Sequence, residues 1–459
     1  MGMSENASLD EHTGLEHQID QWRTWLLRRR AITPDDAAEL EDNLRGRVAD
    51  LRAGGLDDDE AFLVAVRRMG NLDDVSREFA REHSERLWKQ LVLVPGTTSD
   101  ADRRWRDLGV LIGLAVGAGI AVKALLALDD ETFGLNVAFA VLPFLAAYFA
   151  WSRRLPGRVV GALVGLATAV AVVVNLYPFV TDAGGDVGMT YVLTATHLPV
   201  LLWLLLGVAY TGGPWRDHAR RMDFVRFTGE LVIYFALIAL GGGLLTGLLF
   251  ATFEVVDIDI EPFVGDWLMP FAVPGAFFVA AWLVEAKKSV VENMAPVLTR
   301  VFTPLTVVLL VAAFVALLTG GPLTAVDRNL LILMDAILLL VLALLLYSIS
   351  ARDPLAPAGA FDWLQLVLVG VAFAVDVVAL TAMVTRIADA GWTANKAAAL
   401  GLNLVLLVHL VGTGWLLARF LRARGTFDAL ERWQTRYLPV YAAWAAVVVL
   451  VFPPVFAYA

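Results

Sequence analysis

The sequence predicts an all-α, polytopic membrane protein with about eleven transmembrane helices behind a small N-terminal helical bundle. Its composition is 58% hydrophobic and only 18% charged over 459 residues, and its mean hydropathy is +0.66. These values are far more apolar than those of a soluble domain. The charge is unevenly distributed, because residues 1–104 hold 22 of the 46 acidic residues. Long apolar runs begin near Leu108, and Lys and Arg return in every second loop between them.

This division predicts a helical domain at 1–95, a linker at 96–107 and a transmembrane domain at 108–459. The first hundred residues are polar and lack the apolar core of a secretory signal. We therefore expect the N-terminus to stay in the cytoplasm. Arginine greatly outnumbers lysine, and Ala, Val and Gly are abundant, which favours a GC-rich bacterial genome and hence a bacterial inner membrane.

Four short amphipathic helices are expected in the N-terminal domain. Ser8 and Glu11 have the spacing of a capping box. Thr33 is expected to cap a second helix with Pro34 at its first position, and Asp57 to open a third. A fourth is expected from about Asp73. Apolar side chains recur every three or four residues along the first two helices, at Leu15, Ile19, Trp22 and Leu26, and at Leu40, Leu44, Val48 and Leu51.

The N-terminal domain resembles the permease prefix domain, a helical module found ahead of bacterial membrane permeases. The resemblance covers residues 15–85 and rests on the segments 55–61 and 69–71 and on Phe79. It implies a regulatory or scaffolding role, in which residues 9–92 bind a cytoplasmic protein.

Apolar segments of about 18 residues or more suit a hydrocarbon core about 30 Å thick. Small residues such as Gly109, Gly113 and Gly117 would permit close helix approach in lipid. The segments that we expect to span the membrane are 108–128, 133–151, 159–179, 189–210, 229–250, 267–285, 302–319, 329–349, 362–386, 397–419 and 437–457.

The loop charges predict the orientation of these segments, because Lys and Arg concentrate in cytoplasmic loops. An odd number of spans then places the N-terminus inside and the C-terminus outside. The basic loops, expected inside, are 152–158, 216–226, 287–300, Arg352 and 419–436, and the acidic loops, expected outside, are 129–131, 182–186 and 254–266.

The region from Phe224 onward, especially 292–424, resembles a family of bacterial multi-pass membrane proteins of unknown function. The segments that carry the resemblance are 293–298 and 391–396. Lys396 departs from the arginine that this family more often has there. The resemblance implies a topology and no activity.

Two aspartates lie inside apolar segments, where a charged side chain costs about 2.5 to 3.5 kcal/mol to insert. Asp335 and Asp376 lie on consecutive segments, at depths of roughly 10 and 16 Å from the outer ends at 1.5 Å per residue. Two carboxyls close together suit a proton or cation site. The alternative is that each pairs with Lys123, Arg386 or a helix hydroxyl.

Two further features could belong to a transport site. His409, with Asn403 six residues before it, adds a titratable group suited to proton relay; a packed, hydrogen-bonded histidine is the alternative. Pro270, Pro274 and Gly275 could break the sixth transmembrane helix, as in the binding sites of transporters; a kinked helix is the alternative.

Other classes of function are disfavoured. The net charge of −10 argues against nucleic-acid binding. The chain has no cysteine, and it lacks the phosphate-loop, His-Glu-x-x-His and Gly-x-Ser-x-Gly motifs, so we expect no enzyme, cofactor or metal site. The acidic loop 254–261 could offer oxygens to a hard cation, but its lack of EF-hand spacing favours a solvated loop.

Two functions are compatible with these features. The first is a permease-like protein of the inner membrane that moves a small solute or ion, with Asp335, Asp376, His409 and Asn403 as candidate site residues and the lipid bilayer as its surroundings. The alternative is a membrane-embedded signalling or scaffold protein whose prefix domain binds a cytoplasmic regulator. The oligomeric state is not predictable from the sequence.

Overall fold

A computed structural model describes residues 15–24, 34–53, 56–68, 98–181, 187–286, 295–319 and 328–459. The chain forms two compact units, Met1–Asp102 and Arg103–Ala459. The described residues of both are helical apart from turns and one isolated β-bridge between Thr181 and Val187. The all-α prediction is therefore confirmed.

The first unit has its own hydrophobic core. Residues 15–24 are helical, and they are followed by α2 (Pro34–Ala53) and α3 (Asp58–Arg68). Asp57 accepts a hydrogen bond from the backbone N–H of Glu60 at 2.7 Å, so it opens α3 as its position predicts. The expected capping box at Ser8 and the expected fourth helix lie outside the described residues. The core consists of Leu15, Ile19, Trp22, Ala37, Leu40, Leu44, Val48, Ala61 and Ala65.

Ion pairs fasten the first helical segment to α2. Arg45 donates to both carboxylate oxygens of Glu16, at 2.6 and 2.8 Å, and to Glu41 at 2.9 Å. These carboxylates raise the pKa of the Arg45 guanidinium above its usual value. The pairs are solvated, so each contributes little, about 0.2 to 1 kcal/mol, and the apolar core supplies most of the stability.

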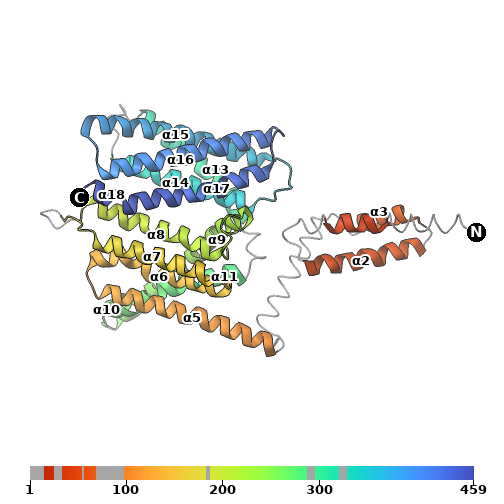
Figure 1. The fold of residues 1–459 in the computed structure, drawn as a ribbon, viewed down its shortest axis with the longest axis horizontal. Helices are drawn as coiled ribbons and strands as arrows, with labels where there is room; N and C mark the ends of the chain where they lie inside the picture. Colours follow the sequence, from red (N-terminus) through yellow and green to blue (C-terminus); the bar gives the residue numbers. More distant parts are fainter. Residues whose placement is uncertain are drawn as a thin grey trace, which may run out of the picture. The chain divides into compact units, whose positions relative to one another are not determined.

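The second unit is a bundle of long apolar helices (Figure 1). In lipid, a helix satisfies its own backbone hydrogen bonds, which explains why every apolar segment takes this form. Its elements are α5 (Thr98–Leu126), α6 (Asp130–Ser152), α7 (Gly157–Leu176), α8 (Met189–Tyr210), α9 (His218–Val255), α10 (Glu261–Phe263), the π-helical turn η1 (Val264–Leu268), α11 (Met269–Ala286), α13 (Ala295–Thr319), α14 (Arg328–Ala351), α15 (Ala360–Ala390), α16 (Ala394–Leu421), α17 (Phe427–Leu450) and α18 (Phe452–Val455).

Among the described residues, ten helices are long and apolar enough to cross a membrane. The chain is therefore a multi-pass membrane protein. The predicted eleventh span, 437–457, falls on α17 and α18 and is not one of the ten. The first half of α17 carries Asp428, Glu431, Arg432 and Arg436, which lower its hydropathy. The expected linker 96–107 also differs, because α5 already begins at Thr98.

The helices form two groups that meet along α8 and α17 (Figure 1). One group contains α13, α14, α15 and α16, which pack on one another, and the other contains α6, α8, α9 and α11. Helix α17 packs against both α8 and α16. It approaches α16 closely because the indole rings of Trp444 and Trp433 occupy the positions that a Cβ would take at Gly401 and Gly412.

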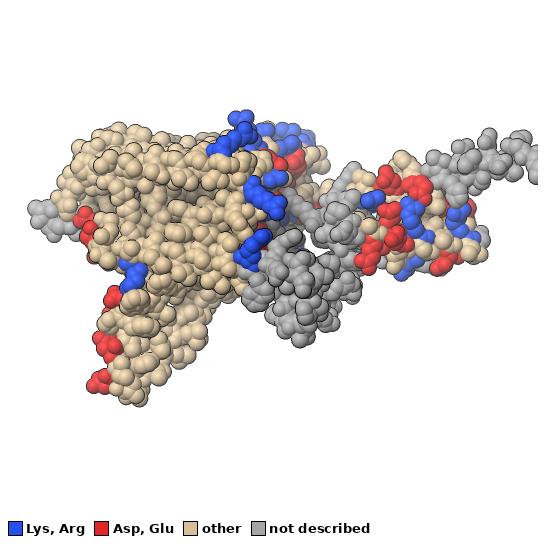
Figure 2. Space-filling view, turned by 60° about the horizontal axis from the view of Figure 1, so that its bottom comes forward, with Lys and Arg blue, Asp and Glu red and all other residues tan. Residues whose placement is uncertain are grey.

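Basic side chains gather at one end of this bundle and acidic side chains at the opposite end (Figure 2). At the basic end, Arg153 pairs with Glu285 at 2.7 Å, and Arg221 donates to the carbonyl oxygen of Thr435 at 3.1 Å. At the acidic end, the hydroxyl of Tyr191 donates to the carbonyl of Glu131 at 2.5 Å. Charges that alternate from loop to loop along the sequence are therefore separated between the two ends of the bundle in the structure.

Helix α11 runs unbroken through Pro274 and Gly275, which corrects the predicted break at Pro270, Pro274 and Gly275. The helical geometry is irregular in the π-helical turn η1, which comes just before α11. Pro270 has no N–H to donate to the carbonyl four residues earlier, which belongs to Asp266. Lys123 donates to that carbonyl instead, at 2.6 Å, so the orphaned acceptor is satisfied without a break in the helix.

Candidate functional site

A cluster of polar side chains lies among α14, α15 and α16, in the interior of the membrane unit. Asn403 on α16 is fully buried, and its amide Nδ2 donates to Oδ1 of Asp335 on α14 at 2.9 Å. Asp376 on α15 is also fully buried. Helix α15, which carries Asp376, packs against both α14 and α16. The structure therefore brings together three of the four residues that the sequence singled out.

Apolar packing fixes this arrangement. The buried face of α14 includes Met334 and Ile337, which are one and two residues from Asp335 in the chain. It packs against Ala372 and Val375 of α15 and against Leu406 of α16. This packing encloses Asp376 completely and leaves Asp335 half-buried.

Asp376 is the most unusual member of the cluster. Among the described residues, neither of its carboxylate oxygens has a hydrogen-bond partner, and Oδ1 of Asn403 has none either. An ionised carboxylate buried without a partner is expensive by several kcal/mol. Asp376 must therefore be neutralised, either by a proton or by a bound cation.

A pocket of about 470 Å³ leads to this cluster from the end of the bundle where α15 joins α16. Helices α8, α14, α15 and α16 form its walls. Arg386 and Lys396 line it close to the α15–α16 junction, and Asp335 lines it deeper in the bundle. Asp376 is not among the residues that line the pocket.

The alternative of an ion pair for the aspartates is not what the structure contains. Lys123 contacts Asp266 and lies 4.0 Å from the centre of the Trp267 ring. Asp335 has its hydrogen bond from Asn403 and, within the described part of the chain, forms no ion pair. Arg386 shares the pocket with Asp335, without a salt bridge to it.

His409 belongs to a different cluster, between α16 and α17. Its Nδ1 lies 2.6 Å from the hydroxyl oxygen of Tyr441, and its ring stacks on Tyr437 with 4.6 Å between centroids. The indole N–H of Trp433 donates to the carbonyl of His409 at 3.2 Å. This matches the alternative of a packed, hydrogen-bonded histidine. Asn403 faces α14, whereas His409 faces α17.

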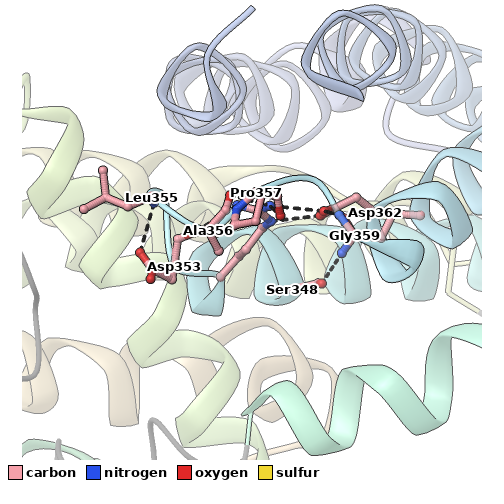
Figure 3. A network of polar contacts seen from close by, with 9 residues as sticks. Ser348, Asp353, Leu355, Ala356, Pro357, Gly359 and Asp362 are labelled. Carbon is pink, nitrogen blue, oxygen red and sulfur yellow. Dashed lines mark hydrogen bonds and ion pairs between the residues drawn. The ribbon is translucent and has the colours of Figure 1, made fainter. Parts of the chain in front are cut away.

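A second buried carboxylate on α15, Asp362, was missed by sequence reasoning (Figure 3). Arg352 donates two hydrogen bonds to the Asp362 carboxylate, of 2.9 and 3.1 Å. The backbone N–H of Gly359 donates to it at 2.8 Å. Arg352 also donates to the carbonyls of Asp353, Ala356 and Pro357, so it ties together the whole α14–α15 turn.

Another missed acid is Glu230, which is 3% exposed on α9. It stands at the edge of the expected span 229–250, where a charge is unremarkable in a sequence. The neighbouring Gly229 allows the ring of Tyr347 on α14 to approach α9 closely. The signal that could have found Glu230 is its place within a helix. Helix α9 begins at His218, well before the apolar run, so Glu230 lies inside it and not at its end.

No group of three or more His, Asp or Glu side chains within the described ranges could hold a metal ion. In the acidic segment 254–261, Glu254 belongs to the last turn of α9. Asp259 accepts from the backbone N–H of Glu261 at 2.9 Å, at the start of the short helix α10.

Comparison with known proteins adds no assignment: no protein-family model, curated protein or solved structure matches this chain. The resemblances of the N-terminal unit to the permease prefix domain and of the later region to an uncharacterised membrane family stay predictions.

Proposed function

We propose that this membrane protein is permease-like and moves a proton or a small solute through the α14–α16 region. The observation that carries the proposal is Asp376, a fully buried carboxyl whose two oxygens have no hydrogen-bond partner among the described residues. Ionisable groups within transmembrane helices commonly mark ion pathways and proton relays.

The arrangement supports an order of events. A proton or solute reaches Asp335 from the pocket, where Asn403 holds the carboxyl in position. A proton then passes from Asp335 to Asp376 on the neighbouring helix α15. Two carboxylates in one buried cluster are not ionised together at low cost, because their like charges repel each other. Transfer between them keeps a single charge in the cluster.

Proton flux into liposomes tests the proposal. Purified full-length protein is reconstituted with a pH-sensitive dye inside, and a potassium gradient with valinomycin supplies the driving potential. We expect dye acidification well above that of empty liposomes, and a loss of at least tenfold in Asp376→Asn. Asp335→Asn should have a comparable effect.

The matched control is Asp389→Asn, which removes an exposed carboxyl from the same helix, α15. This variant should keep the full flux, because Asp389 lies outside the cluster. Flux at the level of empty liposomes for the unaltered protein, across proton, sodium and potassium gradients, would contradict transport of these ions. Unchanged flux in Asp376→Asn would remove the assigned role of that residue.

A second function, membrane-embedded signalling or scaffolding, is favoured by the first unit. Its described helices bury a core of their own and present charged outer faces, as a binding module does. A fragment of residues 1–95, used as bait in crosslinked native cells, should enrich one cytoplasmic protein that the full-length chain also enriches. Failure of the full-length chain to retain any partner would count against this role.

We infer that the basic end of the bundle faces the cytoplasm of a bacterial cell and the acidic end the outside. The support is the charge separation between the two ends (Figure 2) and the tendency of Lys and Arg to stay inside. In this orientation the pocket opens outward. Cysteine labelling of Asp130→Cys and Arg424→Cys by a membrane-impermeant reagent in intact cells should modify the first and spare the second.

A further inference from the structure

The pocket beside Asp335 carries opposite charges at its two ends. Near the α15–α16 junction it is lined by Arg386 and Lys396, and deeper it is lined by Asp335. Lys396 donates to the carbonyls of Gly391 and Arg386, at 2.8 and 3.3 Å. Both acceptors are carbonyls at the C-terminal end of α15, and these contacts hold the ammonium in place at the junction.

The junction end has a further feature that suits an anion. Helix α16 begins at Ala394, and the side chain of Thr393 at its N-cap makes no capping hydrogen bond. Thr393 and Asn395 line the pocket together with Lys396. The first-turn N–H groups of a long helix carry partial positive charge, and here they lie beside a lysine and an arginine. This end is built to receive a carboxylate.

The deep end suits a cation. Asp335 accepts a hydrogen bond from Asn403 through Oδ1 only, so its second oxygen has no donor among the described residues. A protonated amine supplies both the charge and the donors that this oxygen lacks. The Asn403 contact fixes the carboxyl so that it does not need to reorganise when the amine arrives.

The spacing and the walls define what joins the two charges. Lys396 and Asn403 are seven residues apart on α16, a rise of about 10 Å at 1.5 Å per residue. The wall between them is mostly apolar and includes Leu331, Met383 and Leu402, and His197 of α8 also lines the pocket. The volume of about 470 Å³ lies in the range of small-molecule sites. A hydrocarbon spacer about as long as this wall fits it, whereas the phosphate and amine of an ethanolamine lipid headgroup stand too close together.

We propose that this pocket binds a small ω-amino carboxylate, with its carboxylate at the N-terminus of α16 beside Lys396 and its amine against Asp335. A simple fatty acid would place apolar carbon against Asp335, and a simple amine would leave the basic end unoccupied. The inference rests on the proposed function in taking Asp335 as the residue that a solute first meets, and it names the class of that solute.

Equilibrium binding to the full-length protein in phosphatidylcholine nanodiscs tests the inference, with radiolabelled 8-aminooctanoate as the probe. We expect 8-aminooctanoate to bind at least tenfold more tightly than glycine, 4-aminobutanoate, octanoate or octylamine. Equal affinity for the long and short amino acids, or for 8-aminooctanoate and octanoate, would overturn the proposal. It would mean that the pocket does not bind the amine and the carboxylate of the ligand at the same time.

Variants assign each end of the ligand. Lys396→Gln should weaken 8-aminooctanoate at least fivefold and leave octylamine unchanged. Asp335→Asn should weaken it by a similar factor and leave octanoate unchanged. The unchanged partner ligand shows that each variant is folded. Lys123→Gln, a lysine outside the pocket, is the matched control and should bind like the unaltered protein.

Binding and flux fail independently. Proton flux without selective binding of 8-aminooctanoate would overturn this inference and leave the proposed function intact. Selective binding without flux of protons, or of the labelled probe, would leave the binding site intact and overturn transport. Two results would place the ligand elsewhere. One is a loss of selectivity in Lys123→Gln, and the other is unchanged selectivity in both Lys396→Gln and Asp335→Asn.

Discussion

Helix α15 carries two buried carboxylates with opposite surroundings. Asp362 is 4% exposed and receives two hydrogen bonds from Arg352 and one from the backbone of Gly359. Asp376 is fully buried and has no hydrogen-bond partner among the described residues. The same residue type on the same helix is compensated in one place and uncompensated in the other. Compensation stabilises a turn, whereas its absence leaves a carboxyl whose ionised form is costly where it is buried.

Removal of the partner of Asp362 should have the largest effect on stability. Arg352→Met keeps an unbranched stem to pack on Phe420 and Phe427, whose rings lie 4.8 and 4.5 Å from the guanidinium, and it leaves Asp362 buried without its cation. We expect a loss of about 3 kcal/mol in the free energy of unfolding, as for a broken buried ion pair. Equilibrium unfolding in mixed micelles measures it.

The double variant Arg352→Met, Asp362→Asn is the control for this prediction. It removes the stranded charge and should recover a large part of the lost stability, which a double-mutant cycle quantifies. If Arg352→Met alone is as stable as the unaltered protein, the network in Figure 3 does not hold the α14–α15 turn.

Asp376→Leu should behave in the opposite way. Because this substitution removes a buried polar group without a partner, we expect unchanged stability or a gain of about 1 kcal/mol, together with loss of flux. The same unfolding assay measures the stability. A loss comparable to that of Arg352→Met would mean that Asp376 is compensated after all, and the contrast between the two carboxylates would disappear.

The smallest expected effect concerns a solvated carboxylate, Asp129, which precedes α6. The backbone N–H and hydroxyl of Thr132 donate to it at 2.7 and 2.9 Å, and these bonds hold the pKa of the Asp129 carboxyl below its usual range. A pKa that is lower in the folded state contributes stability above the unfolded-state pKa, and this contribution is lost as the pH falls through the folded-state pKa.

Asp129→Asn keeps a capping side chain but removes the charge. The melting temperature of the unaltered protein should therefore exceed that of the variant slightly at neutral pH, and the two should converge as the pH is lowered below the usual range of an aspartate. A difference that persists unchanged into acid would show that the charge of Asp129 has no part in capping α6.

The sequence was informative where a pattern repeats along one helix. Apolar run length predicted ten of the membrane helices, because the hydrocarbon core sets a minimum length that few other structures share. Cap residues such as Asp57 and Pro34 predicted helix starts, because capping depends on neighbours within one turn. The burial of Asp376 was also predictable, since this residue stands in an apolar run.

Interactions between helices were not readable in this way. The sequence offered Gly109, Gly113 and Gly117 as sites of close approach, yet among these only Gly117 faces a nearby side chain, that of Phe144. The close approaches of α16 to α17 use Gly401 and Gly412 instead. Which glycine meets a partner depends on how each helix is rotated, and short segments of sequence do not encode that rotation.

The sequence by itself determined the composition-driven features of this protein: helices throughout, many membrane crossings, a polar N-terminal unit and charge that alternates between loops. Only the tertiary structure decided that Asn403 meets Asp335 while His409 meets Tyr441, and that Arg352 serves Asp362. The physical reason is the distance along the chain over which each effect acts. Hydropathy and capping act within one helix, whereas compensation of a buried charge depends on a side chain that packing brings from another helix.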